Sequence, residues 1–319
     1  MDDFNPTQIP PLAIDEDGAG RRRFLKCSAW AGAGVLWTMA GGVPRSIGLG
    51  FGEAAQADTL GFSFVQISDS HIGFNKAPNP DAAGTYKEAV QKVKDLTTRP
   101  AFMIHTGDVS HLAKPEQFDT AEQIIKEANL DVHYVPGEHD VLGDDGKAFF
   151  ERFSNNAKGW YSFDQSGVHF VALVNVLAFK AGGTGHLGAE QLAWLEADLK
   201  QRSASTPIVV FTHIPLWLVY ADWGWGTDDA AQAMTYLKRF GSVTVLNGHI
   251  HQIIQKVEGT VSFYTADSTA FPQPAPGTAP NPGPMKVEPE RLKSLLGIRS
   301  VTLVSGTQPL AVIDTPLHA

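Results

Sequence analysis

The chain has 319 residues, 43% of them hydrophobic, which is enough for one large domain or two small ones with a substantial core. Its formal net charge is −9. Basic residues form a run only between Arg21 and Lys26, so the chain lacks the phosphate-neutralising face of a general nucleic-acid-binding protein. These properties describe an ordinary globular protein and exclude the class that binds polyanions through a basic surface.

Residues 1–57 have the composition of an export signal. The basic run from Arg21 to Lys26 precedes an apolar stretch from Cys27 to Val43 and a small-x-small cleavage sequence that ends at Ala57. The arginines, with Phe-Leu-Lys behind them, resemble a twin-arginine signal, which is read by the twin-arginine export machinery and moves folded proteins. We expect cleavage after Ala57 and a periplasmic or secreted product.

The alternative interpretation of this segment is a transmembrane anchor. Its apolar run is shorter than the roughly 20 residues that a spanning helix needs, and it is diluted with glycine. No comparable apolar run follows it, so we expect no stable membrane insertion after cleavage. The single cysteine, Cys27, would leave with the signal, which excludes disulfides and thiolate metal ligands from the mature chain.

Residues 58–319 alternate short apolar runs with longer helical periodicities, which predicts one α/β domain. In its first half, strands are predicted at residues 62–67, 101–104 and 132–135, and helices at residues 86–97 and 116–130.

The second half begins with strands at residues 160–163 and 168–174, which flank a predicted hairpin loop. Residues 272–284 are rich in proline and glycine, and we interpret them as a solvated loop rather than a lid. The remaining predictions are strands at 207–211, 243–246 and 261–264, helices at 187–201 and 230–240, and one or two closing strands within 300–314.

Polar clusters follow directly after these predicted strands. Sites in α/β sheets form at the carboxyl ends of the strands, because the strand ends converge there while the connecting loops vary. We therefore expect the clusters to meet in space. Their metal-ligating side chains are Asp69, His71, Asp108, Glu138, His213, His249 and His251.

These side chains supply three carboxylates and four imidazoles. This number exceeds one tetrahedral zinc site and suits two metal ions that share a bridging carboxylate. Two cations about 3.5–4 Å apart lower the pKa of a bridging water, orient a phosphorus centre and neutralise its oxygens. The set therefore predicts the hydrolysis of a phosphate ester.

The ordered motifs resemble those of the calcineurin-like metallophosphoesterases, whose pattern runs D-x-H, G-D, G-N-H-D/E, H and G-H-x-H. The resemblance implies a four-layer α/β-β/α sandwich, with two mixed sheets flanked by helices. The D-x-H form of the first motif points to the cyclic-nucleotide phosphodiesterase-like and general phosphodiesterase branches. The matching segments are Asp69-Ser70-His71, Gly107-Asp108, Gly137-Glu138-His139-Asp140, His213 and Gly248-His249-Ile250-His251.

The resemblance also implies two metal ions per chain, of the iron, manganese or zinc class, and a metal-bridging hydroxide as nucleophile. His139 would protonate the leaving oxygen or steady the phosphate, and Asp140 would hold the His139 ring in its productive orientation. The implied ligands are Asp69, His71 and His251 for the first ion, Glu138, His213 and His249 for the second, and Asp108 for both.

Glu138 departs from the family pattern, which has asparagine at this position. A carboxylate in place of a neutral carbonyl strengthens cation binding, and our hypothesis is a harder or more highly charged second ion, such as ferric iron beside a divalent metal. The same carboxylate could make the metal centre a poorer Lewis acid, which keeps open a metal-binding scaffold without turnover. His139 and Asp140 argue against the scaffold.

The other histidines have less specific interpretations. His105 is interpreted as core or as support for a ligand, His186 as part of the approach to a helix, and His111 is left open between structure and the mouth of the site. The aromatic residues Trp217, Tyr220, Trp223 and Trp225 either pack their loop or contact substrate, and we favour packing. Structural roles are expected for His133, His169 and His318.

The predicted function is hydrolysis of a small-molecule phosphodiester by an exported metalloenzyme. A phosphomonoesterase or a pyrophosphohydrolase on the same site is the enzymatic alternative, because these activities differ by pocket shape rather than by ligand motif.

Overall fold

The computed structural model describes residues 36–40, 43–47, 60–154, 156–178, 183–304 and 311–318. The chain divides into two compact units, Met1–Ala57 and Asp58–Ala319. In the first unit, β1 (Leu36–Ala40) pairs antiparallel with β2 (Val43–Ile47), and the rest of the predicted export signal lies outside the described residues. Within the described part of the chain, no helix is long and apolar enough to span a membrane.

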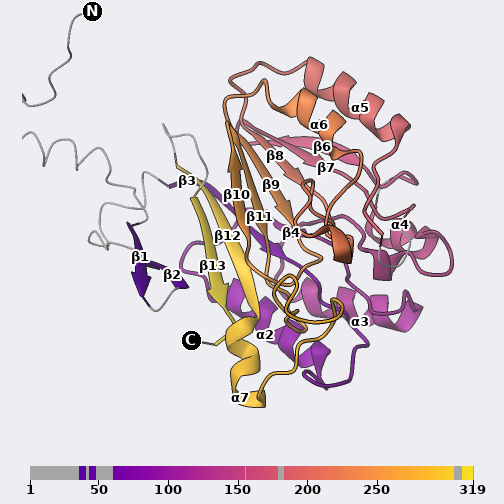
Figure 1. The fold of residues 1–319 in the computed structure, drawn as a ribbon, viewed down its shortest axis with the longest axis vertical. Coiled ribbons are helices and arrows are strands. Elements are labelled where there is room, and N and C mark those ends of the chain that lie inside the picture. Colours follow the sequence, from indigo (N-terminus) through magenta and orange to yellow (C-terminus); the bar gives the residue numbers. More distant parts are fainter. Residues whose placement is uncertain are drawn as a thin grey trace, which may run out of the picture. The chain divides into compact units, whose positions relative to one another are not determined.

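The second unit contains two sheets (Figure 1). In the five-stranded sheet, β3, β4 and β5 run parallel, and β12 joins β3 antiparallel. Its order is β13 (Ala311–Pro316), β12 (Gly297–Val304), β3 (Leu60–Ile67), β4 (Met103–His105) and β5 (Val132–Tyr134).

In the six-stranded sheet, β7, β8, β9 and β11 run parallel, and antiparallel strands form both edges. Both sheets are mixed, as predicted. The order of this sheet is β10 (Gln255–Glu258), β11 (Val261–Thr265), β9 (Val243–Asn247), β8 (Ile208–Phe211), β7 (Val168–Ala172) and β6 (Tyr161–Gln165).

Helices cover the outer faces of the two sheets. The five-stranded sheet packs against α2 (Ala82–Lys94), α3 (Pro115–Lys126) and α4 (Lys147–Phe153). The six-stranded sheet packs against α5 (Ala189–Lys200) and α6 (Ala230–Leu237). Figure 1 shows these two helical layers at opposite ends of the view with the strands between them, so the four-layer sandwich is confirmed.

Strand β3 shows why the layers form. Successive side chains of a strand point to opposite faces. Phe62 and Phe64 belong to the core between the sheets, whereas Val65 and Ile67 belong to the core under the helices. Both faces of the strand are therefore apolar, as a strand between two cores requires.

Element boundaries differ from the predictions where local hydrogen bonds decide them. The helix predicted at 86–97 begins at Ala82, because the Asp81 side chain accepts a hydrogen bond from the amide of Gly84. The helix predicted at 116–130 ends at Lys126, because the following turn closes with i→i−3 bonds and Asn129 has a left-handed φ of 51°.

The closing segment forms two strands, β12 and β13. The predictions missed α4, β10, the short helix α7 (Pro289–Leu292) and the 3₁₀ turns η1 (Glu138–Asp140), η2 (Ala221–Trp223) and η3 (Lys293–Leu295).

Candidate metal centre

The predicted ligands gather at the carboxyl ends of strands from both sheets. Asp69 and His71 follow β3, and Asp108 follows β4. Glu138 begins η1, just beyond β5. The other sheet contributes His213 after β8 and His249 and His251 after β9. Every one of these residues belongs to at least one group whose potential ligand atoms lie within 4.8 Å of one another.

The first ligand group consists of Asp69, His71 and His251. His251 Nε2 lies 3.2 Å from Asp69 Oδ1 and 3.2 Å from His71 Nε2. All three side chains are buried. This is the set predicted for the first metal ion.

The second ligand group consists of Glu138, His213 and His249. His213 Nε2 lies 2.8 Å from Glu138 Oε2, and His249 Nδ1 lies 3.0 Å from Glu138 Oε1. Asp108 lies between the groups, because its Oδ2 is 3.4 Å from His71 Nε2 and 3.5 Å from His213 Nε2. The Asp108 carboxylate therefore adjoins both groups.

Backbone carbonyl groups orient two of the ligand rings. His213 Nδ1 lies 2.7 Å from the carbonyl oxygen of Thr106, and His251 Nδ1 lies 2.6 Å from that of Phe271. With the proton on Nδ1, each ring presents the lone pair of Nε2 to the centre of the cluster. Metal-ligating histidines are held in this manner by a hydrogen bond from the nitrogen that does not bind the metal.

The donor set fits metal ions. The Nε2 atoms of His71 and His251 face each other, and two imidazole lone pairs at that separation are stabilised by a cation between them. His213 Nε2 is buried and has no well-formed hydrogen bond to any described residue. Nitrogen and carboxylate ligands suit zinc, iron and manganese.

The backbone at the ligands is strained. Asp69, His71, Asp108, His249 and His251 all have φ between 41° and 71°, in the left-handed region that such residues rarely adopt. Strain of this kind persists where the surrounding structure determines it, and it clusters at functional sites. The chain thus holds the ligand side chains in one place at a cost in backbone energy.

Two glycines of the motifs allow the ligand loops to approach each other closely. A Cβ at Gly248 would lie 2.0 Å from Ser68 Oγ and 2.4 Å from Asp69 Oδ2, and a Cβ at Gly107 would lie 2.5 Å from His213 Nδ1. The amide of His249 donates to Asp69 Oδ1 over 3.1 Å, which joins the two sheets at the site. Only glycine fits at these positions.

The His139 ring is positioned by His111. His139 Nδ1 lies 2.7 Å from the carbonyl oxygen of His111, which leaves Nε2 for the pocket. The two rings stack with centroids 4.9 Å apart, and His111 Nδ1 lies 3.4 Å from His71 Nδ1. His111 therefore lines the pocket, where its ring contacts both His71 and His139 and its carbonyl group contacts His139.

The predicted role of Asp140 is wrong. Its carboxylate accepts hydrogen bonds from the amides of Val109, Ser110 and Gly137 and from Ser110 Oγ, at 2.8 to 3.0 Å, so it does not hold the His139 ring. The physical reason is that free amides of two loops converge on this buried carboxylate. Asp140 instead joins the Asp108 loop to the His139 loop.

Charges in the cluster oppose the effect of burial on the pKa values of Glu138 and His139, and the charge of Asp108 adds to it at Asp140. Burial alone raises the pKa of Glu138, but the charges and hydrogen bonds of His249 and His213 hold that pKa well below its usual range. Burial lowers the pKa of His139, while the charges of Asp108 and Glu138 outweigh it and raise that pKa. Burial and nearby Asp108 raise the pKa of Asp140 to about 7.

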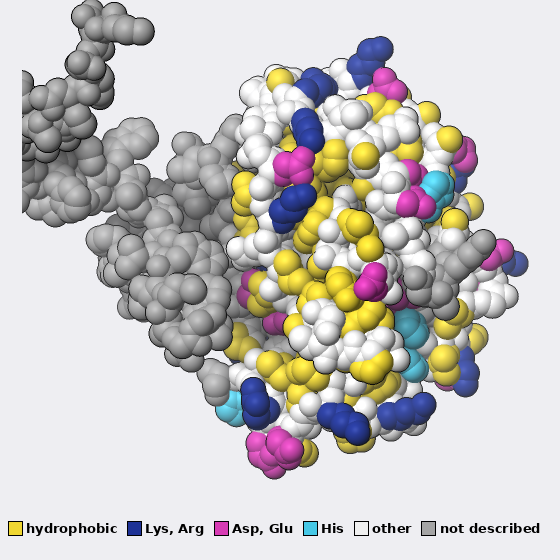
Figure 2. Space-filling view, viewed as in Figure 1, with side chains coloured by type: hydrophobic (Ala, Val, Ile, Leu, Met, Phe, Trp, Pro, Cys, Tyr) yellow, Lys and Arg dark blue, Asp and Glu magenta, His cyan; other side chains and the backbone are white. Residues whose placement is uncertain are grey.

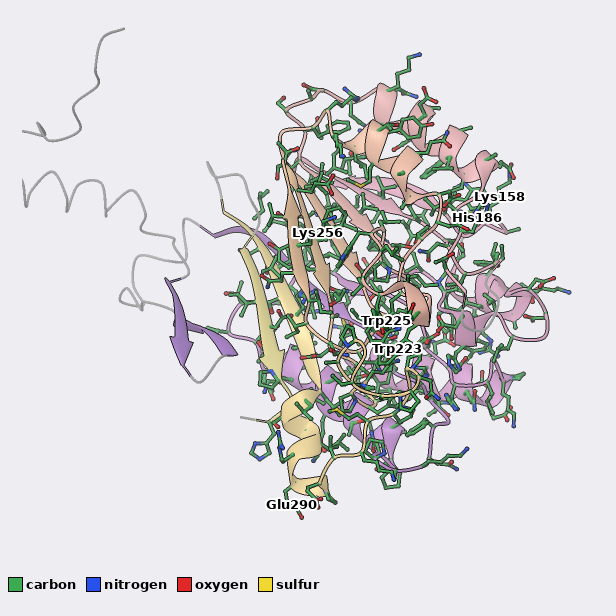
Figure 3. The ribbon with its side chains drawn as sticks, in the orientation of Figure 1. Lys158, His186, Trp223, Trp225, Lys256 and Glu290 are labelled. Atoms are coloured by element: carbon green, nitrogen blue, oxygen red, sulfur yellow. The ribbon has the colours of Figure 1, made fainter. Side chains whose placement is uncertain are left out.

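The remaining histidines support the structure. His105 Nε2 lies 2.6 Å from Ser70 Oγ and is buried beside the first ligand group. The buried His169 ring lies between Asp164 and Asp198, and the His133 ring stacks on Phe163 at 3.9 Å. His186 pairs with Asp228 on the approach to α5, away from the tryptophans labelled in Figure 3.

Of the aromatic residues in the loop after His213, one packs against the core and two line the pocket. Trp217 packs against Phe263, as favoured by the sequence. Trp223 and Trp225 are also buried, yet both line the pocket that contains the metal ligands. Figure 2 shows histidine side chains among hydrophobic side chains on the viewed face.

Comparison with known proteins agrees with the site. A sequence model described as calcineurin-like phosphoesterase matches residues 62–253. The serine/threonine-protein phosphatase CPPED1 of Danio rerio is 29% identical over 236 residues, covering 64% of this chain and 74% of that protein. A 3',5'-cyclic-nucleotide phosphodiesterase of Nostoc is 22% identical over 220 residues, covering 67% and 80%.

Solved structures share the fold. A dimetal phosphatase from Danio rerio superposes with a TM-score of 0.62 at 15% identity and covers 81% of this chain and 97% of that one. A purple acid phosphatase from yellow lupin gives 0.54 at 14% identity, with 80% and 51% covered. With the family model matching more than half of its residues, this chain belongs to the calcineurin-like phosphoesterase family and is a hydrolase of phosphate esters.

Proposed function

We propose that the protein is an exported phosphodiesterase that uses two metal ions. The observation that carries this proposal is the pair of ligand groups on either side of Asp108, with His139 adjoining them. When bound, two cations supply an activated water and neutralise charge on the phosphate oxygens.

The protein residues have separate tasks in this reaction. Asp69, His71 and His251 would hold one ion, and Glu138, His213 and His249 the other, with Asp108 between them. Water adds to phosphorus and releases one proton, and the P–O bond to the leaving group breaks. The leaving oxygen takes a proton from His139, which the released proton restores, so the products are an alcohol and a phosphomonoester.

The charge of the pocket supports a diester substrate. Its described lining residues include the carboxylate of Asp145 but no lysine or arginine. A diester carries one negative charge, whereas a phosphomonoester carries about 1.5 to 2 at neutral pH. Some relatives are named as cyclic-nucleotide or glycerophosphodiester phosphodiesterases, whereas CPPED1 is named as a phosphatase, so a phosphomonoesterase is the second candidate.

The first experiment compares a bis-aryl phosphate with the matching mono-aryl phosphate, with metals quantified in the same protein sample. We expect faster diester cleavage with about two metal ions per chain. His139→Ala should lower kcat by about 10²- to 10⁴-fold with metal content unchanged. The control is His186→Ala, because His186 is 44% exposed and lies outside the pocket lining.

Each other outcome of this experiment has a defined meaning. Faster monoester cleavage would establish the second candidate. No cleavage of either ester, with both metals bound, would support the scaffold without turnover.

Glu138 supports a more highly charged ion in the second group. Its two oxygens face His213 and His249, so the carboxylate occupies the position of a ligand. We propose ferric iron there, beside a divalent ion. Metal analysis that finds two zinc ions and no iron would reject this assignment, and Glu138→Asn should weaken the binding of the second ion.

Export rests on the sequence of residues 1–57. We propose cleavage after Ala57 in a periplasmic or secreted protein. Replacing Arg21 and Arg22 with lysine should retain the protein in the cytoplasm, as measured by cell fractionation. A mature N-terminus other than Asp58 would overturn the proposed cleavage position.

A further inference from the structure

The pocket beside the ligand groups is larger than a phosphate group requires. Its volume is about 580 Å³, in the range of sites for drug-sized ligands. Its polar lining includes five of the candidate ligands, together with His111 and His139. Much of the remaining lining is apolar. The apolar lining residues are Val141, Leu142, Val176, Leu177, Trp223, Trp225, Phe271, Pro282 and Pro284, which we call the apolar wall.

The tryptophans of the apolar wall are held firmly against the metal centre. Trp223 and Trp225, labelled in Figure 3, meet edge to face with centroids 4.9 Å apart. Both pack against Ile250, which stands between His249 and His251 in the sequence. The amide of Trp225 donates to the Tyr220 carbonyl group over 3.1 Å. These two tryptophans are therefore held in place by the protein itself, so little of their conformational entropy is lost on binding.

Two leucines of the wall are exposed at the pocket. Leu142 is 47% exposed and Leu177 is 42% exposed, although both are large apolar side chains. Exposed apolar surface grouped around a polar centre is typical of a ligand-binding site. A hydrophobic group seated here would remove this surface from water.

From this wall we infer the substrate class: a singly charged phosphodiester with one alkyl or aryl ester group that is large and hydrophobic. The inference rests on the proposed function, since the ester must be bound at the metal centre. The hydrophobic group lies on the apolar wall, and the phosphodiester faces Asp108 and His139. The other ester group is not specified.

The test uses methyl alkyl phosphates whose alkyl chain grows from methyl to octyl, with released alcohol quantified by chromatography. We expect kcat/KM to rise by up to about fourfold for each added methylene, the equivalent of about 0.8 kcal/mol. An ester of the same length with ether oxygens in its chain should be cleaved more slowly than the hexyl ester. An aryl methyl phosphate tests whether rings and chains are both accepted.

Binding is measured separately from turnover. A hexyl(methyl)phosphinate carries one negative charge and cannot be hydrolysed, because both substituents are joined to phosphorus by carbon. Its affinity, from calorimetry, should exceed that of dimethylphosphinate. Leu177→Gln should reduce this difference at least fourfold, whereas Leu218→Gln should not, because Leu218 is 59% exposed and lies outside the pocket lining.

The outcomes separate this inference from the proposed function. Cleavage of all esters at the same rate, or equal rates for the hexyl and ether esters, would overturn the inference and leave the phosphodiesterase intact. Phosphinate affinity that rises with chain length, without cleavage of any ester, would support the apolar wall and reject the proposed reaction.

Discussion

The buried side chains at the two ends of the interface between the sheets differ sharply in polarity. At one end the rings of Phe62, Phe64, Phe102 and Phe170 pack together, with Phe64 and Phe102 stacked at 5.2 Å. At the end beside the metal ligands, the buried side chains are polar: Gln66, Thr106, Asn247 and Arg299. One interface therefore contains an apolar end and a polar end.

The polar end forms a chain of hydrogen bonds that reaches a metal ligand. Arg299 donates to Gln66 Oε1 over 3.2 Å, and Gln66 donates to Thr106 Oγ1 over 2.9 Å. Thr106 donates to Ser68 Oγ over 2.7 Å, and Ser68 donates to Asp69 Oδ2. Burying polar groups costs free energy unless they are paired. The main effect of this end of the interface is therefore to position the Asp69 side chain rather than to stabilise the fold.

The largest expected effect comes from the apolar end. Phe64→Ala should lower the free energy of unfolding by about 3–5 kcal/mol, because it empties a fully buried ring site. Metal content per folded chain should stay unchanged. Urea unfolding and metal analysis of the same sample check this. If the folded variant lost its metals, the apolar end would also determine the ligand geometry, which contradicts the division of roles between the two ends.

At the polar end, we expect metal affinity to fall strongly and stability to fall little. Ser68→Ala removes the hydroxyl group that donates to Asp69, so metal affinity should fall about 10- to 100-fold. The free energy of unfolding should fall by only about 1–3 kcal/mol. The matched control is Ser162→Ala, which removes a hydrogen bond from β6 of the other sheet to Asp198 of α5. Equal metal affinities in both variants would show that the hydrogen-bond chain does not position Asp69.

The ligands were predictable because their motifs follow strand ends. Asp69 and Asp108 follow neighbouring parallel strands of one sheet, and His213 follows a parallel strand of the other. Residue type then limits the chemistry. The division of these side chains into two ligand groups came from the resemblance to the calcineurin-like metallophosphoesterases, because neither strand ends nor residue type distinguishes one ion from the other.

The supporting contacts were not predictable in the same way. Asp140 accepts from amides of Val109 and Ser110, and the positions of those amides depend on how two loops meet. The hydrogen-bond chain from Arg299 joins residues 233 positions apart at Gln66, so no local pattern reveals it. Asp81 at the start of α2 was a readable capping signal that the periodicity of the helix obscured.

The pH dependence of stability distinguishes the two ends further. At the apolar end, burial lowers the pKa of His133 to about 4, against about 6.5 in the unfolded chain. The unfolded state therefore takes up a proton first, and stability falls as the pH decreases from about 6.5 to about 4. His133→Phe should remove this contribution, at most about 1.4 kcal/mol per pH unit. Urea unfolding of metal-free protein at several pH values measures it, and parallel curves for variant and wild type would contradict the assignment.

At the polar end, the pH dependence of stability should have the opposite sign. Burial and the charge of Asp314 raise the pKa of Asp267 to about 7, although Arg299 acts in the other direction. The folded state therefore retains a proton that the unfolded chain loses near pH 3.8, so stability falls as the pH rises from about 4 to about 7. Asp267→Asn should remove this loss and stabilise the metal-free protein above pH 7. A variant that is less stable than wild type at pH 8 would show that the ionised carboxylate stabilises the polar end, and the difference between the two ends would then lie in packing alone.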